Sequence, residues 1–242
     1  MTASTRHAEP AIRLERLSKV YGEGVTRVLA VDDVSFDVDG GEFVVLLGPS
    51  GSGKTTMLNM IGAIEEPTSG RLLVRGREVA GLDEGSRTAY RRAEVGFVFQ
   101  LYNLVPSLTA RENVQLIAEI TGPDAAERSM AALERVGIAE RSEHFPGQLS
   151  GGQQQLVAIA RAIVKHPSVL LCDEPTGALD LERGRVVLGV LASLADEGRS
   201  VVCVTHNSTI ANMATRVLRL SDGRIVDDVQ QPSPVPAGDL VW

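Results

Sequence analysis

The opening third of the chain alternates apolar and polar residues with a period of two. The alternation is clear in IRLERL at residues 12–17 and in VDDVSFDV at 31–38, and an unbroken apolar run, FVVLL, follows at 43–47. Alternation is typical of strands with one buried face, whereas an unbroken apolar run is typical of a strand buried on both faces. Two further runs with strand character, RLLVRG and VGFVFQ, follow a helix-like stretch, TTMLNMIGAI. The first hundred residues are therefore predicted to be rich in strands.

The pattern changes near residue 101. From about 101 to 165, apolar residues recur at helical spacing, as in TARENVQLIAEI and AERSMAALERVGI. Strand and helix patterns then return in SVLLCDE, ERGRVVLGVLASLADEG and SVVCVTH, and Asp222-Gly223 predicts the turn of a closing hairpin. Strands that alternate with helices indicate a largely parallel sheet. We therefore expect an α/β fold with a mixed sheet and an inserted helical subdomain at about 101–165.

The two ends of the chain differ from its body. Residues 1–10 are predicted to form a flexible start and the Pro-rich residues 230–242 an irregular tail, around one domain at 11–229. With 242 residues, of which 43% are hydrophobic, the chain can bury one substantial core. Its net charge of −7 argues against nucleic acid as a main partner, because nucleic-acid-binding proteins usually carry a basic face. Cys172 and Cys203 each lie in an apolar run and are expected to be buried free thiols.

Nothing in the sequence predicts a segment that enters a membrane. The first residues, MTASTRHAEPAIRLERL, lack the apolar stretch of a signal peptide. The longest apolar runs, such as FVVLLG, are far too short to cross a bilayer. We therefore expect the chain to be cytosolic by itself, so that any action on a membrane would require the spanning helices of another protein.

One motif points to nucleotide chemistry. Residues 48–55 fit GxxxxGK[ST] in full, after an apolar strand and at the start of a helix. In such a loop glycines let backbone N–H groups surround phosphates, the lysine neutralises charge on the β- and γ-phosphates, and the hydroxyl ligates Mg²⁺. A simple Gly-rich turn is the alternative, but the flanking strand and helix favour a phosphate site. The predicted nucleotide-binding residues are Gly48, Pro49, Ser50, Gly51, Ser52, Gly53, Lys54, Thr55 and Thr56, with Lys54 also catalytic and Thr55 also a metal ligand.

Two adjacent carboxylates end a second apolar strand. Asp173 and Glu174 follow VLLC, and the carboxyl ends of parallel strands are where α/β sheets bind their ligands. Asp173 is then placed to organise Mg²⁺, and Glu174 is placed to polarise the attacking water. Two acids that merely cap the following segment would explain this pattern equally well by themselves. The phosphate loop favours the catalytic interpretation.

A second helix start has the same anion-binding character. LSGGQ at residues 149–153 leads into the helical pattern QQLVAIARAIV, and its serine can cap that helix while the glycines expose the backbone. A Gly-rich N-cap accounts for the pattern only in part. Here the sequence resembles the ABC ATPase family, in which this pentapeptide is the signature, and the resemblance runs from about Ile12 to Asp228. In that family the signature of one subunit closes over the γ-phosphate held by the phosphate loop of the other. The resemblance thus adds nucleotide contacts by Ser150, Gly151, Gly152 and Gln153.

The same resemblance assigns roles to four further residues. Tyr21 matches the aromatic residue that stacks on adenine, and Gln100 matches the glutamine that reaches Mg²⁺ or the attacking water and senses the membrane subunit. Asp180 matches an aspartate that crosses the dimer interface, and His206 matches the histidine that contacts the γ-phosphate. The resemblance therefore implies a P-loop NTPase fold, ATP and Mg²⁺ as ligands, a homodimer, and an ABC permease as membrane partner. Glu174, His206, Lys54 and Gln100 are the expected catalytic set.

Longer phrases indicate a subgroup. FQLYNLVPSLTARENV and CDEPTGALD resemble the lipoprotein-release and macrolide-exporter ATPases most, with the cell-division ATPase close to them. Leu156 stands where an arginine is common, and Asn207 where an aspartate often follows the histidine. The main expectation is an ATP-hydrolysing subunit that drives export through a separate permease, and the alternative is cell-division-type signalling without transport. A soluble ABC ATPase of DNA repair or translation is disfavoured, because the sequence has no coiled coil, zinc insertion or second cassette.

Overall fold

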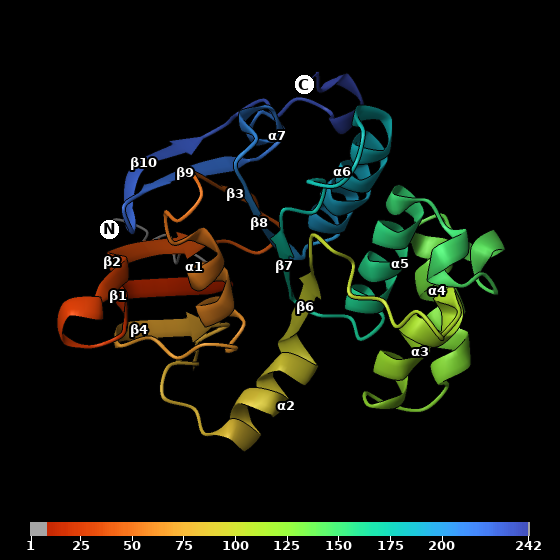
Figure 1. Cartoon of the computed structure of the whole chain (residues 1–242), viewed down its shortest axis with the longest axis horizontal. Helices are drawn as coiled ribbons and strands as arrows, with labels where there is room; N and C mark the ends of the chain where they lie inside the picture. Colours follow the sequence, from red (N-terminus) through yellow and green to blue (C-terminus); the bar gives the residue numbers. More distant parts are fainter. Residues whose placement is uncertain (1–8, 242) are drawn as a thin grey trace, which may run out of the picture.

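The computed structural model describes residues 9–241 as two β-sheets with packed helices and a separate group of helices at one side (Figure 1). The strands are β1 (Ile12–Tyr21), β2 (Val28–Val38), β3 (Phe43–Leu47), β4 (Ser69–Val74), β5 (Arg77–Glu78), β6 (Val95–Val98), β7 (Val169–Asp173), β8 (Ser200–Thr205), β9 (Arg216–Ser221) and β10 (Arg224–Gln230). The α-helices are α1 (Lys54–Ile61), α2 (Glu84–Glu94), α3 (Ala110–Glu119), α4 (Ala125–Arg135), α5 (Gly151–Ile163), α6 (Leu181–Asp196) and α7 (Ser208–Ala211).

The larger sheet positions the chemistry. Its order is β10-β9-β3-β8-β7-β6, and all neighbours are parallel except the hairpin of β9 and β10. Every residue of β3 and β8 is buried, which explains why these strands read as unbroken apolar runs. Cys172 and Cys203 are register partners on β7 and β8, and both are free and buried. The predicted α/β fold with a mixed sheet is confirmed, including the closing hairpin.

The smaller sheet is antiparallel, with the order β2-β1-β4-β5. The period-two alternation of β1 puts Ile12 and Leu14 into the core. The pairing of β1 with β2 shifts register near Arg16 and Asp33, whose φ values are 51° and 50°. Helix α1 lies between the two sheets, so its apolar face, including Met57, joins one core with both of them (Figure 1). This packing holds the start of α1 against the carboxyl end of β3.

Helices α3, α4 and α5 form the separate group at the right of Figure 1. Helix α3 begins with a capping box in which Thr109 and Glu112 exchange hydrogen bonds, and these caps stabilise a helix end whose N–H groups have no helical partner. Helix α5 is apolar over much of its surface because it is buried between this group and the larger sheet. Leu156 is 8% exposed and belongs to this core, so the position at which the resemblance leads us to expect an arginine is used here for packing.

Two features lie beyond the sequence-based expectations. Helix α2 was not predicted, because its sequence is polar and it buries only Tyr90. The Pro-rich carboxyl-terminal segment has little regular structure, but it packs on α6. Leu240 is 2% exposed, and its carbonyl oxygen accepts hydrogen bonds from Arg185. Among residues 9–241, every helix is too short or too polar to cross a membrane.

Candidate active site

The phosphate-loop motif forms a tight turn between β3 and α1. Gly53 has a φ of 99°, and a Cβ atom there would lie 2.2 Å from the carbonyl oxygen of Ala30. A Cβ atom on Gly48 would lie 2.3 Å from the carbonyl oxygen of Leu220. Only glycine fits at both positions, so these residues let neighbouring strands approach the loop closely. The loop then delivers the chain into α1 with the helix N-terminus pointing at the space in front of β3.

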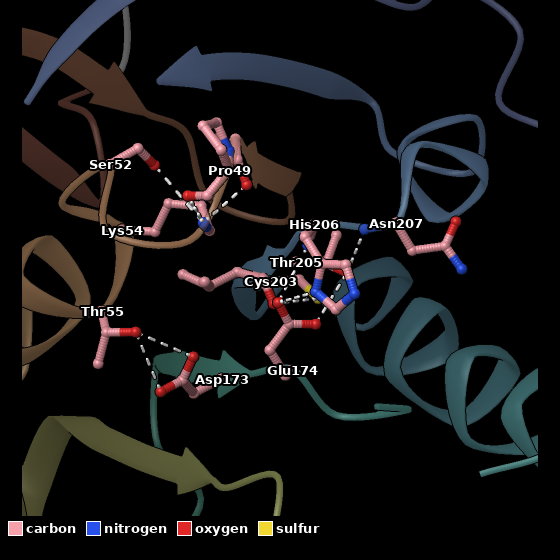
Figure 2. A network of polar contacts seen from close by, with 12 residues as sticks. Pro49, Ser52, Lys54, Thr55, Asp173, Glu174, Cys203, Thr205, His206 and Asn207 are labelled. Atoms are coloured by element: carbon pink, nitrogen blue, oxygen red, sulfur yellow. Dashed lines mark hydrogen bonds and ion pairs between the residues drawn. The ribbon is translucent and has the colours of Figure 1, made fainter. Parts of the chain in front are cut away.

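Lys54 lies inside the curl of this loop. Its Nζ atom donates hydrogen bonds to the carbonyl oxygens of Gly48 and Pro49 at 2.8 and 2.7 Å (Figure 2). Burial lowers the pKa of Lys54, and the negative charges of Glu174 and Asp173 act in the opposite direction. The loop thus holds a cation 6% exposed at its centre, where neutral carbonyl groups satisfy it. An anion that entered the loop would offer this ammonium group a stronger, charge-assisted partner.

Glu174 is held by the end of β8. Its Oε1 atom accepts a hydrogen bond from the backbone N–H of His206 at 3.0 Å and lies 2.7 Å from His206 Nδ1. Its Oε2 atom accepts a hydrogen bond from the hydroxyl of Thr205 at 3.1 Å (Figure 2). The backbone of Glu174 has a φ of 46°, in the left-handed region that non-glycine residues enter at a cost. The carboxylate therefore has a fixed orientation, although its backbone conformation is unfavourable.

Thr55 and Asp173 form a second polar pair beside the loop. The hydroxyl of Thr55 lies 3.3 Å from Asp173 Oδ1, and Figure 2 shows the pair apart from the Glu174 network. Burial raises the pKa of Asp173, which the hydrogen bond from Thr55 partly offsets. A hydroxyl and a carboxylate are hard oxygen donors of the kind that Mg²⁺ accepts. The described residues contain no cluster of three His, Cys, Asp or Glu side chains, so a cation here would need further oxygens from its substrate.

These groups line one cleft of about 480 Å³. Its volume lies within the range of small-molecule sites. Gln100, two residues beyond β6, lines the same cleft, and its amide packs against Gly177. The structure therefore brings together predicted residues from three separate strand ends and from the phosphate loop. They are Ser50, Gly51, Gly53, Lys54, Thr55, Thr56, Gln100, Asp173, Glu174 and His206.

The signature residues lie elsewhere on the chain. Ser150 caps α5 in a capping box with Gln153, whose Oε1 atom accepts from the Ser150 backbone N–H at 2.9 Å. Asp180 caps α6 by accepting from the N–H of Arg183 at 3.0 Å. None of the residues 149–153 and 180 is among the described residues that line the cleft. The starts of α1 and α5 thus both have anion-binding character, and of these two only the start of α1 lines the cleft.

Tyr21 lies at the end of β1, outside the lining of the cleft. Its hydroxyl donates to Glu65 and lies 3.4 Å from the hydroxyl of Thr56 on α1. The ammonium group of Lys19 is 5.1 Å from the ring centroid, and the residue is 38% exposed. The ring is thus held beside the phosphate loop with surface available for stacking.

Sequence reasoning missed some contributions to the site. Thr205 carried no motif of its own, but it orients Glu174, and the only available signal was a hydroxyl residue next to His206 at a strand end. In the sequence, Asn207 stands out only as a departure from the family pattern, in which an aspartate often follows the histidine. Its side chain accepts a hydrogen bond from the N–H of Thr209 at 2.9 Å, so it caps α7 as an aspartate would.

Comparison with known proteins agrees with this geometry. The family "ABC transporter" matches residues 31–177. The macrolide export ATP-binding/permease protein MacB of Rhodospirillum rubrum is 46% identical over 229 residues, which cover 93% of this chain and 35% of that protein. MacB 1/2 of Paracoccus denitrificans is 49% identical over 230 residues, with coverage of 93% and 34%. This chain spans about a third of the length of these relatives.

Solved structures give the same result for the fold. The dimeric ATP-binding cassette MJ0796, bound to ADP and Pi in a post-hydrolysis state, matches with a TM-score of 0.83 and 38% identity, over 92% of this chain and 99% of that one. The protein cbiO1 of Clostridium perfringens, part of the ABC transporter complex cbiONQ, matches with a TM-score of 0.84 and 26% identity, over 92% and 89%. The chain belongs to the ABC transporter family and is an ATP-binding and ATP-hydrolysing cassette.

Proposed function

We propose that two copies of this chain hydrolyse ATP at composite sites, each made from the phosphate loop of one copy and the signature of the other. The observation that carries the proposal is the separation of the two anion-binding helix starts. Helix α1 opens into the cleft with Lys54, Glu174 and His206, whereas α5 starts outside it. A second copy could place its α5 start over the cleft, and the similar cassette MJ0796 does form a dimer.

In this site the chain supplies position and electrostatics, which is how phosphoryl transfer is generally catalysed. The loop N–H groups and Lys54 hold the phosphates, and Ser150 with the α5 N-terminus of the second copy faces the developing charge. Glu174 aligns the attacking water and accepts its proton, because its carboxylate is fixed by Thr205 and His206 while it lines the same cleft as Lys54. His206 is 65% exposed at its side chain and can turn toward the γ-phosphate.

The proposal includes a magnesium ion and an adenine contact. Thr55 and Asp173 would hold Mg²⁺, with Gln100, which follows the neighbouring strand β6, as a third contact. When bound there, Mg²⁺ would neutralise charge that develops on the phosphates. Tyr21 would stack on adenine, since its ring is anchored beside α1 through Glu65.

Composite sites make the reaction depend on association of two chains. The hydrolysis rate per chain should therefore rise with chain concentration and level off when the dimer is fully formed. Size-exclusion chromatography at the same concentrations should show the matching rise of an ATP-dependent dimer. A rate per chain that does not change over a hundredfold dilution would contradict the composite site.

We also propose that ATP hydrolysis by this chain drives a membrane permease, which lies on a separate chain or in the same polypeptide. The cassette would then act at the cytoplasmic side of a membrane. A second cleft, of about 270 Å³, lies between β6 and the helices around it. Its floor is apolar, with the rings of Phe97 and Phe99 stacked 5.5 Å apart, and Leu116 at its edge is 44% exposed. This cleft is the site we assign to a cytoplasmic segment of the permease.

The position of this docking cleft explains how a permease could act on ATP. Phe97 and Phe99 line it, and Gln100, the next residue, lines the nucleotide cleft. Arg161 lines it from α5 and donates hydrogen bonds to the carbonyl oxygens of Tyr102 and Asn103, so it ties the segment after Gln100 to the helix that begins with the signature. Movement of a docked segment would therefore reach the nucleotide cleft of one composite site and the signature that completes the other.

The charges of the docking cleft indicate what fits it. Arg91, Arg161 and Lys165 line the cleft, and no acidic side chain of residues 9–241 does, in a chain whose net charge is −7. Lys165 donates to the backbone carbonyl of Arg91, and burial lowers its pKa to about 8. A short amphipathic segment with apolar residues and a carboxylate would satisfy both the floor and the cations.

Co-purification in mild detergent tests the membrane partner. The chain should be recovered with a permease, its ATPase activity should change in the complex, and Lys165→Glu should weaken recovery without reducing ATP binding by the isolated chain. Arg199→Glu is the control, because it makes the same reversal of charge at a residue that does not line the docking cleft and that pairs with Glu197 at the end of α6. Lys19→Glu would not serve, because Lys19 contacts Tyr21. Full recovery of the Lys165 variant would refute the assigned cleft.

A further inference from the structure

Gln155 on α5 is a buried amide without a partner. The residue is 0% exposed, and neither Oε1 nor Nε2 has a hydrogen-bond partner among the described residues. Native proteins satisfy the great majority of buried polar side-chain atoms, so an amide with both atoms unpaired requires an explanation. A methionine or leucine would fill this position at lower cost if it served packing alone.

The helix places Gln155 on the same face as the two glycines of the signature. It follows Gly151 by four residues and Gly152 by three, so all three lie on one face of α5. A Cβ atom on Gly151 would lie 2.7 Å from the hydroxyl of Tyr102, and one on Gly152 would lie 2.9 Å from Cβ of Arg183. Helical side chains lean toward the N-terminus of their helix, so Gln155 leans toward this same contact.

The loop that joins β7 to α6, residues 174–180, reaches this contact through Leu179, whose Cδ2 atom would lie 3.2 Å from a Cβ atom on Gly151. Two of its N–H groups, those of Gly177 and Leu179, are bonded within the loop at 3.0 Å. Thr176, in the same loop, is 8% exposed. The loop begins at Glu174 and ends at Asp180, so its position sets the water-activating acid and the α6 cap together.

We infer that Gln155 is a positioning residue, whose amide bonds the loop 174–180 when α5 shifts against the larger sheet on dimer closure. The inference rests on the proposed composite site. An amide that is unpaired in the isolated chain and paired in the closed dimer favours closure, because the two states then differ in interaction free energy. The signature and Glu174, which belong to two different composite sites, would be locked together through this one side chain.

Gln155→Met tests the inference because it keeps the length of the side chain and removes the amide. The nucleotide-free variant should unfold at a higher temperature than the unchanged chain, since a buried unpaired amide is gone. Its kcat should fall roughly three- to tenfold, the value of one hydrogen bond, with KM for ATP within twofold. In the Glu174→Gln background, the same change should weaken the ATP-dependent dimer by a similar factor in sedimentation analysis.

Gln154→Met is the matched control. The Nε2 atom of Gln154 donates to the carbonyl oxygen of Leu149 at 3.1 Å, so this variant loses a bond that already exists and should unfold at a lower temperature. A lower unfolding temperature for Gln155→Met would show that water or protein already pairs the amide, and would overturn the inference. Unchanged kcat and dimer affinity would overturn it as well. If Glu174→Gln alone fails to dimerise with ATP, the composite site falls and the inference falls with it.

Discussion

Replacing Glu174 by glutamine removes one charge while it keeps the shape of the site. The amide oxygen of glutamine can still accept from the N–H of His206, as Oε1 does at 3.0 Å. The amide nitrogen would face the hydroxyl of Thr205, which now donates to Oε2 at 3.1 Å and which can accept instead. Because hydrogen bonds to charged groups exceed neutral ones by about 1 kcal/mol, the fold should lose no more than about that amount.

The effect on hydrolysis should be far larger. A positioned general base contributes about 10²–10⁴-fold to rate, and each factor of ten corresponds to about 1.4 kcal/mol. The variant should therefore lose about 2.7–5.4 kcal/mol of transition-state stabilisation. ATP binding should persist, since Lys54 and the loop are untouched and one negative charge near the phosphates is removed.

Three measurements on purified Glu174→Gln check this reasoning. Phosphate release should be nearly abolished, equilibrium binding of ATP should be retained, and a dimer should accumulate with ATP in size-exclusion chromatography. Thr205→Val is the matched control, since it keeps the carboxylate and removes one of the groups that orient it, so its loss of rate should be smaller. Hydrolysis within a few-fold of the unchanged chain would refute the assignment of Glu174 as the water-activating acid.

Two further changes test the nucleotide and docking contacts. Tyr21→Ala should weaken ATP binding by about 1–3 kcal/mol, the range for a base stacked on an aromatic ring, while Tyr21→Phe should keep the affinity. Titration with ATP measures the difference, and an alanine variant that binds ATP as tightly as the unchanged chain would assign adenine to another residue. Because burial lowers the pKa of Lys165 to about 8, its charge is present below that pH and lost above it. Binding to an acidic permease segment should therefore weaken as pH rises from 7 to 9, and pH-independent binding measured by co-purification would exclude Lys165 from the contact.

The parts of the site that local sequence encodes could be predicted. The unbroken apolar runs of β3 and β7 indicated buried strands, and GxxxxGK[ST] and the acids after VLLC are short patterns whose chemistry depends on neighbours in the chain. The capping boxes at Thr109 and Ser150 are likewise local, since each involves residues three apart. These features need no knowledge of distant contacts.

Features that depend on long-range pairing could not be predicted. Glu174 meets Thr205 and His206 only because β7 and β8 are neighbours in the larger sheet, which no periodicity encodes. The separate antiparallel sheet arises from pairing of β1 with β2 and β4, and the strand pattern alone is compatible with one sheet. The burial of Gln155 was equally hidden, because a glutamine within QQQ reads as an exposed helix residue until the packing of α5 is known.

Mixing two inactive variants tests the composite site most directly. Lys54→Ala removes the phosphate-loop cation, and Ser150→Arg places a bulky side chain at the signature, so each homodimer should have two defective sites. A mixed dimer joins the intact loop of the Ser150 variant to the intact signature of the Lys54 variant, and therefore contains one complete site. Phosphate release by an equimolar mixture should rise well above that of either variant alone. Each mixed dimer should reach at most half the rate of an unchanged dimer. If the mixture stays as inactive as its components while chromatography shows mixed dimers, the two helix starts do not act on one ATP and the account is wrong.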